Sequence, residues 1–166
     1  MTIRSWRPIP DGQVVLEGDK TAEHWLFELL KSFSRVQGGT RTLVWQHLSV
    51  HSSSLADVLS ARYLGRLNDD DRWAYVTAIA SDVGYTESLA QPTRVFNEAR
   101  AVRNFVAHAQ ELELFTTEGR PSWHYVVSPA WEKKGVPSNL TPRDVRRLAT
   151  GCKWIEYLLQ YLAYLG

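Results

Sequence analysis

The chain has 166 residues, of which 19 are basic and 18 acidic, so its formal net charge is only +1. This balance excludes a protein that binds polyanions over its whole surface, and any nucleic-acid site must be local. Cys152 is the only cysteine, which excludes an internal disulfide or a cysteine-rich zinc site and is typical of the reducing cytoplasm. No apolar run approaches the ~20 residues that a bilayer requires, so we expect one soluble, cytoplasmic domain without a membrane partner.

The chain is expected to consist of an extended arm followed by a helical domain. Residues 1–20 predict the arm, because two prolines and an Asp-Gly turn signal interrupt them. Residues 21–166 predict the domain, since their apolar side chains recur at the three- and four-residue spacing of amphipathic helices. The expected fold class is therefore mainly α.

Three helical regions are expected in the first half of this domain. The first runs from Thr21 to about Val36, and Gly38-Gly39 is expected to end it. The second covers about 41–66, with a kink at the sequence HSSS in its middle. The third begins after Asn68, because asparagine and the aspartates that follow it suit a helix N-terminus. Its apolar residues at helical spacing are Trp73, Val76, Ile79 and Ala80.

The second half is expected to combine two helices with a small β-hairpin. Pro92 opens a helix that should run to about Ala109. Alternating apolar residues then predict the hairpin over about 112–128. Thr141-Pro142-Arg143-Asp144 resembles a capping box with proline at the first helical position, and it begins the last helix. The apolar positions of that helix predict burial on more than one side: Val145, Leu148, Trp154, Ile155, Leu158, Leu159 and Leu162.

The helix after Pro92 has a core face and a polar face when its residues are projected at about 100° per residue. The core face contains Val95, Ala99, Val102 and Val106, with Phe96 and Phe105 at its flanks. The polar face contains Asn97, Arg100, Asn104 and His108. Arg103 lies about 140° from His108 on a straight helix, so the two side chains of one chain meet only if the helix end distorts or the long arginine side chain swings across. Two copies around a two-fold axis can form one cleft that both line, which predicts a homodimer.

The stretch VRNFVAHA in this helix resembles the R-x4-6-H motif of HEPN domains (higher eukaryotes and prokaryotes nucleotide-binding), in which a polar residue, often asparagine, follows the arginine. Here four residues separate Arg103 from His108, and Asn104 follows the arginine. The order of helices is similar as well, and the resemblance covers roughly residues 21–165. Some HEPN toxins carry a tyrosine two residues after the histidine. This chain has Gln110 there, so control by modification of that tyrosine does not apply.

The resemblance implies a HEPN-like helical bundle that acts as a metal-independent endoribonuclease in a toxin or defence setting. The implied partners are an RNA substrate and an antitoxin or other protein. His108 is implied as general base or acid, because the ordinary pKa of histidine lies near ~6.5. Arg103 is implied as the clamp on the scissile phosphate, and Asn104 as the group that orients His108 or the phosphate. We add Arg100, one turn before Asn104, as a substrate-binding residue. No metal and no cofactor are expected.

Two simpler interpretations stand beside this one. Arg103 can be an ordinary surface residue, while Asn104 and His108 terminate a helix whose free carbonyls and dipole favour such side chains. The alternative function in the same fold is a non-catalytic HEPN-like module that binds nucleotide, RNA or a protein partner.

Three further groups of polar side chains have structural explanations. His47 and His51 have the spacing of a helical metal pair, but no third ligand is evident. The three aspartates at 69–71 fit a solvated helix N-terminus better than a Mg²⁺ site. Six basic residues fit a charged exposed face better than an RNA-binding surface: Arg143, Arg146, Arg147, Lys153, Lys133 and Lys134.

Overall fold

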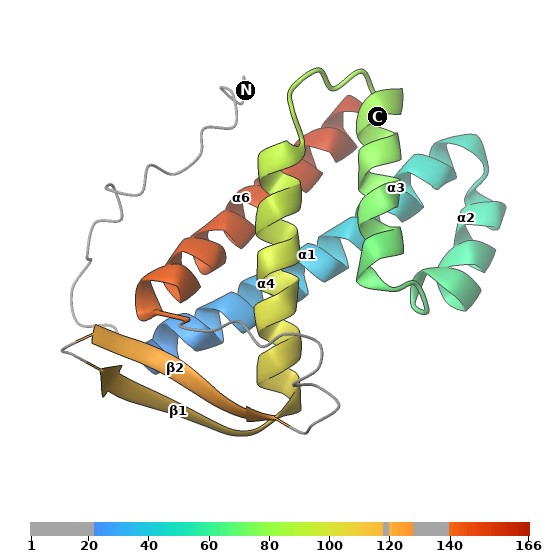
Figure 1. The fold of residues 1–166 in the computed structure, drawn as a ribbon. Coiled ribbons are helices and arrows are strands. Elements are labelled where there is room, and N and C mark those ends of the chain that lie inside the picture. Colours follow the sequence, from blue (N-terminus) through green and yellow to red (C-terminus); the bar gives the residue numbers. More distant parts are fainter. Residues whose placement is uncertain (1–21, 118–119, 128–139) are drawn as a thin grey trace. The chain divides into compact units, whose positions relative to one another are not determined.

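The computed structural model describes residues 22–117, 120–127 and 140–166, and most of these are helical (Figure 1). The prediction of a mainly α protein is therefore confirmed, whereas the predicted N-terminal arm lies outside the described residues. No described helix combines the length and apolar character needed to cross a membrane. The described chain divides into two compact units. One unit contains residues 34–93 and 153–166, and the other contains described residues of 22–33 and 94–152.

Helix α1 (Ala22–His51) is longer than predicted, because it continues through Gly38-Gly39 instead of ending there. A glycine inside a helix costs only about 1 kcal/mol relative to alanine, so burial elsewhere on the helix can outweigh it. Val36 and Leu43, on either side of the glycines, are both buried. Gly39 also has a packing role, since a Cβ there would lie 3.0 Å from Leu159 Cδ1.

The predicted kink at HSSS corresponds to the end of α1 and the start of α2 (Ser53–Leu59), where the Ser52 side chain accepts a hydrogen bond from the Leu55 N–H. A π-helical segment, η1 (Ser60–Leu64), follows α2. Helix α3 (Asp69–Asp82) begins as predicted, because Asn68 Oδ1 accepts the Asp71 N–H at 2.8 Å. Gly84 follows two residues after the end of α3, and its φ of +72° is a left-handed conformation that glycine adopts without steric cost.

The core of the unit formed by residues 34–93 and 153–166 comes from α1, α3 and the second half of α6 (Pro142–Leu165). The four apolar residues that follow at helical spacing in α3 are all buried. Trp154 of α6 differs from its prediction, since it is 46 % exposed and its ring stands 6.1 Å from that of Tyr157. The other buried side chains include Val36, Leu43, Val44, Ala56, Leu64, Ile155, Leu158, Leu159 and Leu162.

The second unit contains most of helix α4 (Ala90–His108), which leads directly into strand β1 (Ala109–Thr117), as Figure 1 shows. Strand β1 pairs antiparallel with β2 (Arg120–Val127), with Leu112 opposite Tyr125 and an irregularity between Ala109 and Glu111. These strands occupy the segment for which a hairpin was predicted, about 112–128.

The core of the second unit is built from α4, the first turns of α1 and the first half of α6. The rings of Phe33 and Phe96 are 5.5 Å apart and both side chains are almost fully buried. The predicted capping box begins α6: Asp144 N–H donates to Thr141 Oγ1, and Thr141 N–H donates to Asp144 Oδ2, each at 3.1 Å. The remaining buried side chains include Leu26, Leu29, Val95, Ala99, Val102, Phe105, Val145, Leu148, Ala149 and Cys152.

Two glycines should respond in opposite directions to replacement by alanine. Gly38 is exposed and a Cβ there meets no atom within 4 Å, so Gly38→Ala should stabilise the protein by about 0.5–1 kcal/mol. A Cβ on Gly151 would lie 2.6 Å from Val95 Cγ1, so Gly151→Ala should destabilise it by about 1–3 kcal/mol. Urea unfolding measures both changes. A Gly151→Ala protein as stable as the wild type would contradict this packing of α6 against α4.

Candidate active site

Helix α4 separates into an apolar and a polar face, largely as the sequence predicts. Val95, Ala99 and Val102 are 4 %, 0 % and 3 % exposed, and the flanking Phe96 and Phe105 are also buried. The prediction was wrong for Val106, which is only half-buried. Val106 lies in the last turn of α4, so no further turn of this helix follows to help cover its side chain.

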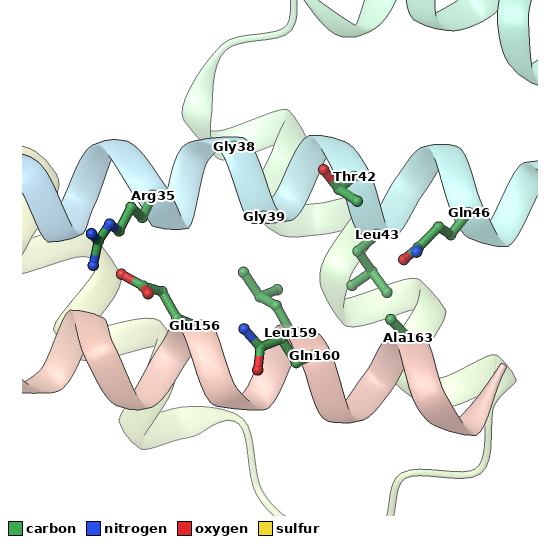
Figure 2. A pocket seen from close by; sticks show the side chains of 10 residues that line it. All are labelled: Arg35, Gly38, Gly39, Thr42, Leu43, Gln46, Glu156, Leu159, Gln160 and Ala163. Atoms are coloured by element: carbon green, nitrogen blue, oxygen red, sulfur yellow. The ribbon is translucent and has the colours of Figure 1, made fainter.

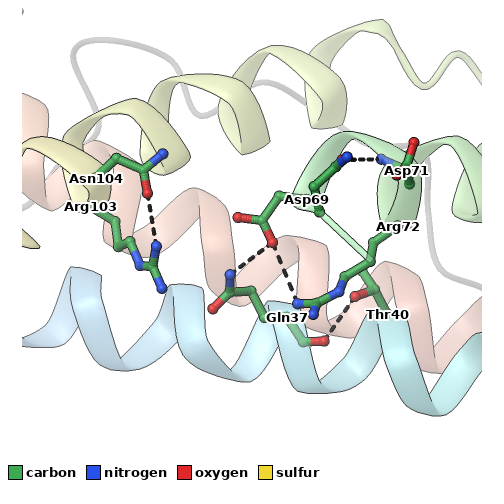
Figure 3. A network of polar contacts seen from close by, with 8 residues as sticks. Gln37, Thr40, Asp69, Asp71, Arg72, Arg103 and Asn104 are labelled. Carbon is green, nitrogen blue, oxygen red and sulfur yellow. Dashed lines mark hydrogen bonds and ion pairs between the residues drawn. The ribbon is translucent and has the colours of Figure 1, made fainter. Parts of the chain in front are cut away.

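Arg103 and Asn104 are joined by a hydrogen bond near the C-terminal end of α4. Arg103 Nη1 donates to Asn104 Oδ1 at 2.8 Å, and both side chains are half-buried (Figure 3). One guanidinium donor is therefore engaged, while a guanidinium has five N–H groups in a fixed planar fork. Asn104 thus holds the position of Arg103 and leaves it able to donate to a phosphate oxygen.

His108 is the last residue of α4 and its side chain is exposed. Strand β1 begins with the next residue, so the motif lies where the helix gives way to an extended chain. This position supplies an exposed imidazole at the end of a rigid element, as proton transfer to a bound substrate requires.

A single copy of α4 brings Arg103 to Asn104 but not to His108. The helix stays regular to His108, so the separation of about 140° between Arg103 and His108 still applies. Asn97, which shares the polar face, is exposed, and Arg100 is half-buried one turn before Asn104. The predicted site residues thus share the accessible part of one helix, on which the Arg103 side chain contacts Asn104.

Two of the basic residues considered as an RNA-binding surface have structural roles instead. Arg146 is only 9 % exposed, and its guanidinium carbon lies 4.7 Å from the centre of the Trp25 ring. Arg147 Nη2 donates to Glu98 Oε2 of α4 at 2.6 Å. Arg143 and Lys153 are exposed, and Lys133 and Lys134 lie outside the described residues. The exposed positive charge on α6 is therefore smaller than the sequence alone suggests.

The other polar candidates have structural partners. His47 Nε2 lies 3.5 Å from Asp82 Oδ2, and the His47 and His51 rings stand edge to face at 5.9 Å. Asp69 accepts a hydrogen bond from Gln37 Nε2 at 2.8 Å (Figure 3). Within residues 22–117, 120–127 and 140–166, no group of three or more His, Cys, Asp or Glu side chains could hold a metal ion.

A groove lined by α1 and α6, in which Arg35 and Glu156 are the charged residues, was not predicted from the sequence. Its lining residues come from two helices far apart in the chain, so no local spacing marks them. The only sequence signal is the pair Gly38-Gly39, which we interpreted as the end of a helix.

No protein-family model, curated protein or solved structure matches this chain.

Proposed function

We propose that this chain is a metal-independent endoribonuclease of HEPN type that acts as a homodimer. The observation that carries the proposal is the arrangement at the end of α4, where Arg103 is hydrogen-bonded to Asn104 and an exposed His108 closes the helix. These are the side chains that the R-x4-6-H motif requires, and they lie on the accessible part of a helix whose other face is buried.

The proposed reaction is attack of the RNA 2′-hydroxyl on the adjacent phosphorus. A bond forms between phosphorus and the 2′-oxygen, and the bond to the 5′-oxygen breaks, which leaves a 2′,3′-cyclic phosphate and a 5′-hydroxyl. His108 removes the 2′-hydroxyl proton as general base, and the leaving 5′-oxygen takes a proton from water. Arg103 binds the non-bridging phosphate oxygens, where negative charge accumulates in the transition state.

The homodimer is part of this proposal because one chain turns Arg103 away from His108. A two-fold axis beside the two α4 ends would bring the arginine of one copy to the histidine of the other. A role as a toxin or defence protein, with an antitoxin or other protein as partner, belongs to the same proposal. The alternative function is a non-catalytic module that binds nucleotide, RNA or a protein. The angular separation of Arg103 and His108 on one helix favours this alternative if the chain stays monomeric.

RNA cleavage should persist at an unchanged rate in excess EDTA. The reason is that Arg103 and His108 supply phosphate binding and proton transfer without a metal. Gel analysis and mass spectrometry of the fragments should show 2′,3′-cyclic phosphate ends, or the monophosphates formed by their hydrolysis, together with 5′-hydroxyl ends.

A His108→Ala protein purified in the same way is the control for contaminating ribonucleases. If cleavage requires Mg²⁺ and EDTA abolishes it, the proposed mechanism is wrong.

A further inference from the structure

A groove with a cavity of about 510 Å³ lies between α1 and the second half of α6 (Figure 2). This volume is within the ~300–1,000 Å³ range of small-molecule sites. All of its lining residues belong to the unit of residues 34–93 and 153–166. Arg35 of α1 and Glu156 of α6 point toward each other at one end of the groove. None of these residues has a role in the proposed cleavage reaction.

The Glu156 carboxylate has an unused hydrogen-bond acceptor. Its Oε1 atom is buried and has no hydrogen-bond partner among the described residues. Burial raises the pKa of this carboxyl above its ordinary value of 4.5, and the positive charges of Arg35 and Lys153 only partly offset that effect. Buried acceptors are almost always satisfied in folded proteins, and a donor on a ligand in the groove that Glu156 lines would satisfy this one.

Glycine and leucine residues are among those that line the groove. Gly38 presents bare backbone, and a Cβ there would meet nothing within 4 Å. Leu43 and Leu159 also line the groove, and each is at most 3 % exposed, so only a thin part of each side chain reaches the surface. Such a surface accepts the face of an aromatic ring, while the charged residues remain at its edge.

We propose that this groove binds a guanine base. In this arrangement the Glu156 carboxylate accepts the N1–H and an exocyclic N2–H, Arg35 donates to O6 and N7, and the ring lies against Gly38 and Leu159. Guanine is the natural base that presents two adjacent donors to a carboxylate and two adjacent acceptors to an arginine. Adenine would instead direct its N1 lone pair at the carboxylate. This proposal does not depend on RNA cleavage at α4.

Guanosine 5′-monophosphate and adenosine 5′-monophosphate are a suitable pair of probes, because their phosphates are identical and any difference comes from the base. Isothermal titration of the full-length protein should show guanosine monophosphate binding at least about tenfold more tightly, the effect of one charge-assisted hydrogen bond. Equal affinities, or no heat of binding at millimolar guanosine monophosphate, would overturn the proposal.

Variants locate the binding in the groove. Glu156→Gln should remove the preference for guanine. It should also strengthen the binding of adenosine monophosphate relative to that of guanosine monophosphate, because a glutamine amide can pair with adenine. Glu87→Gln, the same change at an exposed glutamate outside the groove, should leave both affinities unchanged. Gly38→Phe should fill the groove and abolish binding while the circular dichroism spectrum stays that of the wild type. Guanine preference that survives Glu156→Gln would refute the assignment.

A further titration distinguishes a free nucleotide from a guanine within RNA. The probes are a uridine hexamer and the same hexamer with one central guanosine, both 2′-O-methylated so that attack by a 2′-hydroxyl is impossible. Tighter binding of the guanosine hexamer than of guanosine monophosphate supports a base of an RNA strand as the ligand. Binding of the mononucleotide alone supports a free guanine nucleotide.

Discussion

Replacing His108 by alanine is expected to slow RNA cleavage by about 10²- to 10⁴-fold, the usual contribution of one general acid or base. The stability of the fold should change by no more than about 1 kcal/mol, because the side chain is exposed. Cleavage of a fluorescent RNA measures the first effect, and urea unfolding measures the second. A folded His108→Ala protein that cleaves at the wild-type rate would eliminate the catalytic role.

Asn97→Ala is the matched control, because Asn97 is an exposed polar residue on the same side of α4 and has no assigned role. Its cleavage rate should equal that of the wild type. If neither the wild type nor the controls cleave any RNA, the binding-module alternative gains support.

Mixing two inactive variants tests whether the cleft is shared between copies. Arg103→Ala and His108→Ala proteins should each be inactive, but a heterodimer retains one arginine and one histidine from different chains. Activity should therefore return when the two are mixed and allowed to exchange subunits. A light-scattering mass of one 19.0 kDa chain at all concentrations, or no recovery in the mixture, would count against the composite site.

Val102→Asp should have the largest effect on stability, a loss of about 3–5 kcal/mol, because it places an unpaired charge among packed side chains. Val102 is only 3 % exposed. Such a loss is a large part of the ~5–15 kcal/mol that stabilises a typical domain, so the variant should be mostly unfolded at 37 °C. Thermal melting followed by circular dichroism measures this directly.

Two variants of the same helix serve as controls for this substitution. Asn97→Asp introduces the same charge at an exposed position and should melt like the wild type. Val106→Asp should cause a smaller loss than Val102→Asp, since Val106 is half-buried. Equal losses of stability for Val102→Asp and Val106→Asp would instead agree with the core face that the sequence predicts. They would contradict the different burial of these two residues in the structure.

Features that depend on neighbouring residues could be predicted from the sequence. The Asn68 cap and the Thr141–Asp144 capping box need only side chains three residues from the backbone groups that they satisfy. The buried positions of α3 follow from helical periodicity, which is also local. The motif from Arg103 to His108 was visible for the same reason, because its residues lie within two turns of one helix.

The sequence by itself therefore determined the mainly helical character, the beginnings of α3 and α6, and the two faces of α4. The tertiary structure decided what depends on residues distant in the chain. Helix α1 continues through Gly38-Gly39 because the apolar residues around the glycines are buried, and this burial outweighs a weak local preference. Arg147 is removed from the exposed basic face because Glu98 of another helix binds it. Glu156 acquires its raised pKa only through burial in the fold, which no spacing along one helix could reveal.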